Sequence, residues 1–176
     1  FKLSDGTDAS ATGTEYEIPG GNLEPIPDGS NVMALIDEAK WDKTQDGMNS
    51  FISLRWSVLQ PDQYKNRKVF QKLWVSDHDP NAKSPDAAAK KQEKALRMLA
   101  AIDANAGGAL VASGVTPTDD ALQMHLMNKP MVIKTMVWSM PDSNDPDKTI
   151  SGNWIAELTT SPRAVVSNLP CPLVTL

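Results

Sequence analysis

The sequence predicts a single domain of the α+β class, built mainly of five β-strands with a helical insertion between the third and fourth strands. Apolar residues alternate with polar ones before residue 76 and again after residue 130, whereas the segment between has helical periodicity. A chain of 176 residues with 40% hydrophobic residues can bury one core. We expect residues 31–160 to form this domain, between an acidic extended arm over 1–30 and an irregular tail over 161–176.

The first two strands are predicted to form a hairpin. Apolar and polar side chains alternate over residues 31–41 and again over 51–59. Asp46 and Gly47 lie between these segments, and an Asp-Gly pair favours a tight turn. The apolar parity of the second strand, which includes Trp56, is expected to face the core.

The third predicted strand, residues 68–75, has two chemically different faces. Valine and leucine occupy one parity, and the other parity carries Lys68, Phe70, Lys72 and Trp74. Its outward neighbour is the polar parity of the second strand, which includes Arg55. Cations and aromatic rings are therefore predicted to interleave on one face of the sheet.

Two helices are predicted to follow. Ser84 is a suitable N-cap and Pro85 a suitable first helical residue, and the pair Gly107-Gly108 ends this helix. A second, shorter helix is expected to start at Thr116 or Thr118 and to stop before Pro130.

The last two strands are predicted over residues 131–140 and 153–159, with a polar loop over 141–152. Trp154 is expected to belong to the core. Three strands, a helical insertion and two more strands is the element order of the OB-fold, a five-stranded, partly open Greek-key barrel. The sequence therefore predicts an OB-fold barrel with its helices between the third and fourth strands.

The charge is unevenly distributed along the chain. The formal net charge is −5, yet residues 40–75 hold seven Lys and Arg against three acidic residues, whereas residues 1–30 hold one Lys against six acidic residues. A local basic stripe on an acidic protein can bind a polyanion, because the local field governs the contact. The alternative is that these cations are merely solvated.

Basic side chains beside exposed aromatic rings suit single-stranded nucleic acid. Each ring can stack on a base and each cation can meet a phosphate. Trp41 and Trp74 are expected to be exposed, whereas Phe70 fits either the surface or the core. The candidate nucleic-acid-binding residues are Trp41, Lys43, Arg55, Tyr64, Lys65, Arg67, Lys68, Phe70, Lys72, Trp74, Lys134 and Trp138.

Catalysis has little support in the sequence. It contains no glycine-rich phosphate loop, no serine elbow and no paired carboxylates at a telling spacing. Asp77, His78 and Asp79 are the residues that a nuclease or enzyme accessory would need, but without a partner cluster we interpret them as part of a turn. Cys171 is the only cysteine and excludes an internal disulfide. We expect a protein that is not an enzyme and has no catalytic residues, metal or cofactor.

No apolar run is long enough to span a membrane, and the first residues lack the pattern of a signal peptide. We therefore expect a soluble, cytoplasmic protein without membrane contact. The sequence leaves open whether it forms a homo-oligomer.

Residues 26–158 resemble a family of tailed-phage and prophage single-stranded DNA-binding proteins with an OB-fold. The matches are short: the turn Ile26-Pro27-Asp28-Gly29, the hairpin residues Lys43, Thr44 and Gly47, then Tyr64, Asn66, Arg67, Val69 and Phe70, and finally Gly152-Asn153-Trp154. Ser30 and Asn31 replace an aromatic residue after the turn, and Asp62 stands where glycine is usual.

The resemblance implies a protein that coats single-stranded DNA without sequence preference in phage DNA replication or recombination. It implies location in the host cytoplasm and replication or recombination proteins as further partners. A protein-interaction module or inhibitor on the same barrel, acting through the acidic arm and the apolar tail, is the alternative.

Overall fold

The computed structural model describes residues 24–159, which contain all five expected strands. The strands are β1 (Ser30–Lys43), β2 (Ser50–Gln60), β3 (Lys68–Leu73), β4 (Met131–Pro141) and β5 (Thr149–Thr159). Helices separate the first three strands from the last two, as the sequence predicts. Most of the expected arm and all of the expected tail lie in residues 1–23 and 160–176, outside the described residues.

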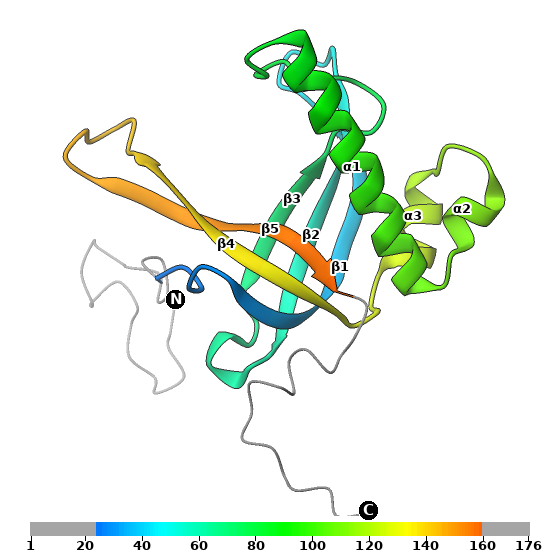
Figure 1. The fold of residues 1–176 in the computed structure, drawn as a ribbon, viewed down its shortest axis with the longest axis horizontal. Coiled ribbons are helices and arrows are strands. Elements are labelled where there is room, and N and C mark those ends of the chain that lie inside the picture. Colours follow the sequence, from blue (N-terminus) through cyan, green and yellow to red (C-terminus); the bar gives the residue numbers. More distant parts are fainter. Residues whose placement is uncertain (1–23, 160–176) are drawn as a thin grey trace, which may run out of the picture.

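All five strands form one antiparallel sheet in the order β3-β2-β1-β4-β5. Figure 1 shows β4 and β5 crossing in front of the other three strands. The edge strands β3 and β5 approach each other, although no strand pairing joins them within the described part of the chain. The protein is thus of the α+β class, with a curved antiparallel sheet.

Alternation along β1 and β2 places apolar side chains on an inner face. Ala34 pairs with Val58 and Ile36 pairs with Trp56, and all four side chains are buried. The expectation that Trp56 belongs to the core is confirmed. A register shift between Ile36 and Glu38 makes Asp37 an extra residue on β1, as in a β-bulge. Two carboxylates consequently follow each other on the outer side of β1, where they meet cations of β2 and β3.

The long helix α1 (Pro85–Ala106) begins and ends where the sequence predicts. The Ser84 hydroxyl accepts a hydrogen bond from the Ala87 amide at 3.1 Å, and Gly107 ends the helix with a φ of 121°. Ala95 and Ile102 are buried against the sheet, whereas Leu96 is exposed. Figure 1 shows α1 lying across one end of the sheet.

Two shorter helices, α2 (Ala109–Ser113) and α3 (Asp119–Leu126), complete the insertion. Thr118 caps α3, which settles the choice between the two predicted threonines. The sequence did not predict α2, because its first amides are satisfied from another helix: the Asp103 carboxylate accepts hydrogen bonds from Leu110 and Val111. None of the helices within residues 24–159 is long and apolar enough to cross a membrane.

The hairpin of β4 and β5 is longer than expected. Pro141 and residues 149–152, predicted as loop, belong to the strands. Only the first part of β4 pairs with β1, through Met131–Thr135, so the outer part of the hairpin extends beyond the sheet, as Figure 1 shows. Polar and glycine residues can hold a strand there because strand pairing, not burial, satisfies their backbone.

Candidate nucleic-acid interface

The outer face of β1, β2 and β3 carries most of the predicted basic and aromatic row. Register places Arg55 opposite Phe70, Ser53 opposite Lys72 and Ser57 opposite Lys68. Phe70 is 68% exposed and lies between the two lysines on β3. We call this surface, formed by Lys40, Arg55, Lys68, Phe70 and Lys72 with Asp37 and Glu38, the outer face.

The two carboxylates of the β1 bulge form ion pairs with three of the cations on the outer face. The Arg55 Nε donates to Asp37 at 2.7 Å, and the Lys68 Nζ donates to the other oxygen of Asp37 at 2.5 Å. Glu38 pairs with Arg55 at 3.0 Å and with Lys40 at 2.8 Å. The sequence pattern does not reveal this network, because regular alternation would put Asp37 and Glu38 on opposite faces of β1, and only the bulge brings both carboxylates to the basic row.

Ionisation of these carboxylates is favoured by their partners. Burial alone would raise the pKa of Asp37, but hydrogen bonds from Lys68 and Arg55 outweigh it and lower the pKa. The hydrogen bond from Lys40 lowers the pKa of Glu38. Both groups therefore stay negative at neutral pH and compete with any phosphate for the same cations.

Lys72 is the exception on the outer face. Among the described residues it forms no ion pair with a carboxylate, although its charge helps to lower the pKa of Asp79, and its Nζ lies 4.9 Å from the centre of the Phe51 ring. An aromatic ring attracts the cation but carries no net charge, so it does not neutralise the ammonium group as a carboxylate does. Lys72 is therefore the cation of the outer face most able to meet a phosphate.

The expectation that Trp74 is exposed is wrong. Trp74 is only 5% exposed and Phe51 only 4%, and their ring centres lie 4.9 Å apart. Strand β3 ends at Leu73, so the alternation that would point Trp74 outward no longer applies. The chain after β3 closes over this end of the sheet, where Asp77 accepts a hydrogen bond from the Ser50 amide at 2.6 Å.

Trp41 is half-buried, and its role is structural. Its indole Nε1 donates to the Pro117 carbonyl at 2.8 Å, and its amide donates to Asp119 at 2.7 Å. These bonds tie the end of β1 to the start of α3. Lys43 is exposed at the end of β1, away from Phe70 in the strand register.

The remaining candidates of the β2–β3 connection lie next to the outer face. Tyr64 packs partly against the core, and Lys65 is exposed. Arg67 donates to the Glu24 carbonyl at 2.7 Å, so its guanidinium holds the chain that leads into the turn before β1. The β2–β3 connection lies at the Lys68 end of the outer face, and Trp74 covers the opposite end.

Two further candidates, Lys134 and Trp138, lie on the hairpin of β4 and β5. Lys134 pairs with Glu157 at 3.7 Å. Trp138 is 38% exposed and its indole packs against Gly152, where a Cβ atom would be 2.7 Å from the ring. Gly152 is thus needed for this ring to rest on the opposite strand.

Trp154 was expected in the core, and that expectation is wrong, because it is 47% exposed. It pairs with Met136 on the same side of the hairpin as Trp138, beyond the part that β1 covers. The sequence signal that could have revealed it is Gly152, a small residue two positions earlier on the same parity.

Asp77, His78 and Asp79 each have a separate partner. Asp77 bonds to Ser50, His78 to Gln92 and Asp79 to Lys91. Burial would raise the pKa of Asp79, but the hydrogen bond from Lys91 lowers it. Within residues 24–159 no group of three or more His, Cys, Asp or Glu residues is placed to hold a metal ion.

Comparison of the sequence with models of known protein families and with curated proteins finds no match. Evidence for a function therefore comes from the outer face itself. Its distinguishing features, within the described part of the chain, are an exposed ring, one cation without a carboxylate partner and three cations already paired with carboxylates.

Proposed function

We propose that this protein binds single-stranded DNA without sequence preference, on the outer face of β1, β2 and β3. The observation that carries the proposal is Phe70, a largely exposed ring in the middle of a strand, with Lys72 two residues away and Arg55 opposite. A buried ring would stabilise the fold. An exposed ring between cations can instead stack on a base while the cations contact phosphates, so it suits a ligand with both π-faces and negative charge.

Stacking is the stronger of the two interactions on this face. A base stacked on an aromatic ring contributes roughly 1–3 kcal/mol. The phosphate contacts are weaker, because Asp37 and Glu38 already hold Arg55, Lys68 and Lys40. Binding is expected to depend on salt, but less steeply than the number of cations suggests.

The OB-fold is the finer description that we propose for the sheet. The strand order β3-β2-β1-β4-β5, with β3 and β5 close together, supports a partly open barrel. The position of α1 between β3 and β4 also supports it. Proteins with this fold bind oligonucleotides on the face of strands 2 and 3, which is where Phe70 and Arg55 lie.

The biological setting follows from the resemblance of residues 26–158 to phage single-stranded DNA-binding proteins. We place the protein in phage DNA replication or recombination, as a non-catalytic protein of the host cytoplasm that protects exposed strands. Replication or recombination proteins are its expected partners besides DNA.

The direct test measures fluorescence anisotropy of a labelled oligo-dT with the wild-type chain and with Phe70→Leu. The variant keeps an apolar side chain but removes the ring, so affinity should fall by roughly tenfold, the value of one lost stack. The control is Met124→Leu on α3, an equally exposed apolar residue away from the outer face. No binding by the wild-type chain, or equal binding by both variants, would contradict the proposal.

The hairpin of β4 and β5 supports a second candidate function, a protein-interaction module. Trp138, Met140, Ile150 and Trp154 are exposed apolar residues on one side of this hairpin. An apolar strip of this kind is typical of a protein contact. Most of the expected arm over 1–30 and all of the expected tail over 161–176 lie outside the described residues, so among residues 24–159 this hairpin is the only observation that favours the alternative.

A further inference from the structure

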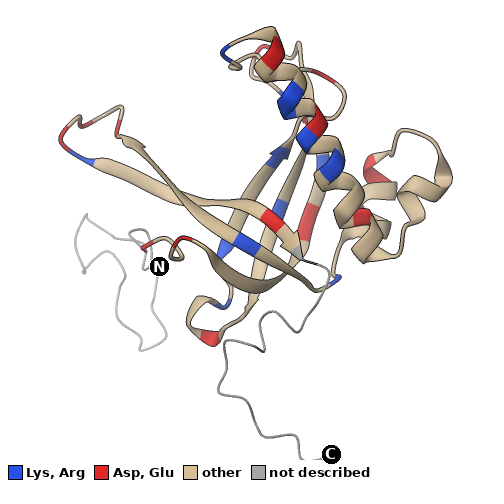
Figure 2. Cartoon of the chain, in the orientation of Figure 1, with Lys and Arg blue, Asp and Glu red and all other residues tan. Residues whose placement is uncertain are grey.

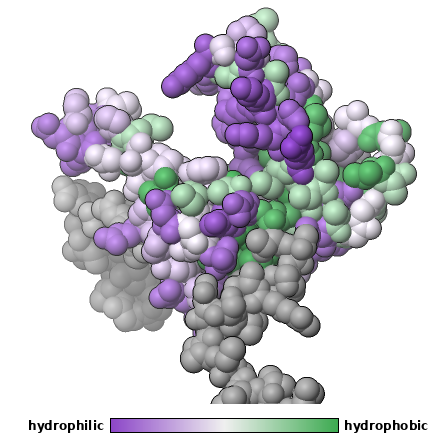
Figure 3. Space-filling model, viewed as in Figure 1, coloured by the Kyte–Doolittle hydropathy of each residue, from purple (hydrophilic) through white to green (hydrophobic). Residues whose placement is uncertain are grey.

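A groove of about 560 Å³ lies between α1 and the edges of β3 and β5. We call it the α1 groove. Its floor is apolar and includes Leu73, Ala95, Met98, Ile155 and Leu158. Figure 3 shows the hollow between α1 and the hairpin, and the volume falls within the range of small-ligand sites, roughly 300–1,000 Å³.

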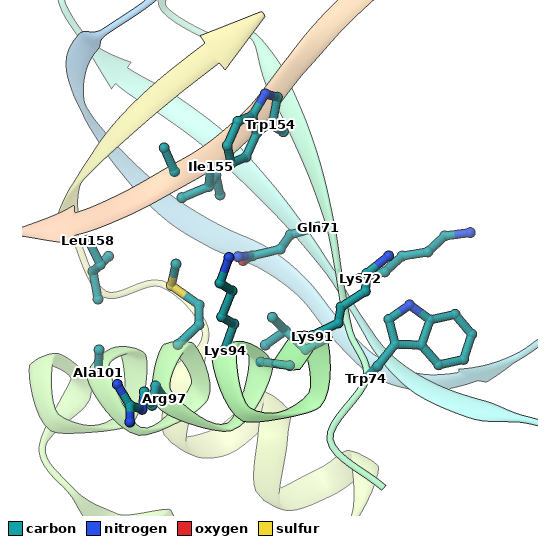
Figure 4. A pocket seen from close by; sticks show the side chains of 14 residues that line it. Gln71, Lys72, Trp74, Lys91, Lys94, Arg97, Ala101, Trp154, Ile155 and Leu158 are labelled. Atoms are coloured by element: carbon teal, nitrogen blue, oxygen red, sulfur yellow. The ribbon is translucent and has the colours of Figure 1, made fainter. Parts of the chain in front are cut away.

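The charged residues that line the α1 groove are all positive. Lys72, Lys91, Lys94 and Arg97 line it, and no lining residue within 24–159 is acidic. Figure 2 shows basic residues recurring along α1. In Figure 4, Lys91 and Lys94 project from α1 toward β3, whereas Arg97 points away from them. The electrostatic character of the groove is therefore set by Lys72, Lys91 and Lys94.

These lysines differ in how free they are. Lys91 is paired with Asp79, and Arg97 with Glu93 at 2.5 Å. Lys94 has no hydrogen bond or ion pair among residues 24–159. Lys72 lies over the Phe51 ring and attracts Asp79 without forming an ion pair with it. Lys94 is thus an unpaired cation that the groove adds to Lys72, which it shares with the outer face.

An aromatic wall faces these lysines. Trp154 stands on β5 at the other side of the groove from Lys94, and its ring is about half exposed. Lys72 belongs to both surfaces, because it lines the groove and also lies on the outer face. A ligand that stacks on Phe70 can therefore continue past Lys72 into the α1 groove, with basic side chains beside it along the whole path.

We infer that the α1 groove holds the continuation of the single strand that binds the outer face, with Lys94 and Lys91 meeting phosphates and Trp154 stacking a base. This inference rests on the proposed function. An acidic peptide would satisfy the lysines, but a single strand satisfies the lysines with its phosphates and the indole of Trp154 with a base, and it also accounts for the path through Lys72 from the outer face. The groove thereby lengthens the site beyond the three strands.

The test compares Lys94→Gln with Lys90→Gln in the full chain. Lys90 is on the same helix, is exposed and does not line the groove, so the two variants lose the same charge. Each protein is titrated at low salt with a short oligo-dT of about 5 nucleotides and a long one of about 15, which bracket the span of one such fold. Poly-glutamate is the acidic-peptide probe.

Lys94→Gln should lower the affinity for the long oligonucleotide by roughly three- to tenfold and should make that affinity less dependent on salt. It should leave the affinity for the short oligonucleotide unchanged. Lys90→Gln should leave both unchanged. Trp154→Leu should likewise lower only the affinity for the long oligonucleotide, since it removes one stacking ring.

Equal long-oligonucleotide affinities of Lys94→Gln and Lys90→Gln would overturn the groove as a DNA site while the proposed function stands. The groove is overturned in the same way if Lys94→Gln loses poly-glutamate binding and keeps its affinity for DNA. A wild-type chain that binds neither oligonucleotide would overturn both the groove and the proposed function.

Discussion

The outer face and the α1 groove both gather cations beside an exposed aromatic ring, yet they differ in their carboxylates. Arg55, Lys68 and Lys40 on the outer face are held by Asp37 and Glu38. At the α1 groove, Asp79 and Glu93 hold Lys91 and Arg97, whereas Lys94 has no ion pair among the described residues. The charge available to a ligand therefore depends on which cations lack an ion-pair partner, not on how many cations a segment contains.

The two regions meet at Trp74, and its replacement has the largest expected effect. Trp74 lines the α1 groove and packs on Phe51 of β2, the strand that carries Arg55 of the outer face. Because this side chain is almost fully buried, Trp74→Ala should lower the free energy of unfolding by about 3 kcal/mol. Urea denaturation followed by circular dichroism measures the change, and a loss of DNA affinity at unchanged stability would instead make Trp74 a stacking residue.

The next largest effect should come from removing the carboxylates that distinguish the two regions. Asp37→Asn with Glu38→Gln frees three cations, so oligo-dT affinity at low salt should rise roughly tenfold and the slope of log affinity against log salt should steepen by about 2. The fold should survive, since exposed ion pairs contribute only about 0–1 kcal/mol. Anisotropy titrations over a salt series measure both quantities.

Asp142→Asn with Asp147→Asn is the matched control for that experiment, because neither carboxylate forms an ion pair among the described residues, whereas Asp145 holds Lys148. It removes two charges from the hairpin tip, away from the basic row. If this control raises the affinity as much as the double variant on β1, net charge rather than freed cations explains the gain.

A smaller effect on oligo-dT affinity should distinguish two lysines of β3. Lys72→Gln removes a cation without a carboxylate partner in the described chain, whereas Lys68→Gln removes one that Asp37 already holds. Affinity for oligo-dT should fall several-fold for Lys72→Gln and roughly twofold or less for Lys68→Gln. Equal losses would show that the ion pairs do not withhold cations from DNA.

The smallest effect concerns pH. The folded-state pKa of Asp37 is lowered, so the stability that its ion pairs contribute is fully present above its unfolded pKa of about 3.9 and is lost as pH falls through the folded pKa. The difference in unfolding free energy between wild type and Asp37→Asn should be constant from neutral pH to about 5 and should shrink below 4. Urea denaturation at several pH values measures it, and a difference that grows on acidification would contradict the lowered pKa.

Local sequence signals predicted most of the fold. Ser84, Pro85 and Gly107 marked both ends of α1, and alternation identified all five strands. The errors arose where partners far along the chain decide the structure. The α2 helix depends on Asp103 of the preceding helix, and Trp154 is exposed because β1 covers only part of the hairpin.

The candidate site was predictable in its ring and cations but not in its charge balance. Strand parity placed Arg55, Lys68, Phe70 and Lys72 on one face. The bulge at Asp37 changes which side chains of β1 join them, and no periodic pattern reveals a bulge in advance. Trp74 failed for a related reason, because the strand ends one residue before it.

The most direct test of the central claim is a map of amide chemical-shift changes in the ¹⁵N-labelled chain on titration with oligo-dT. Binding on the outer face predicts the largest changes at Arg55, Phe70 and Lys72, with little change on α3 at the opposite side of β1. Changes confined to α3 or to the hairpin tip, with β2 and β3 undisturbed, would contradict binding on the outer face.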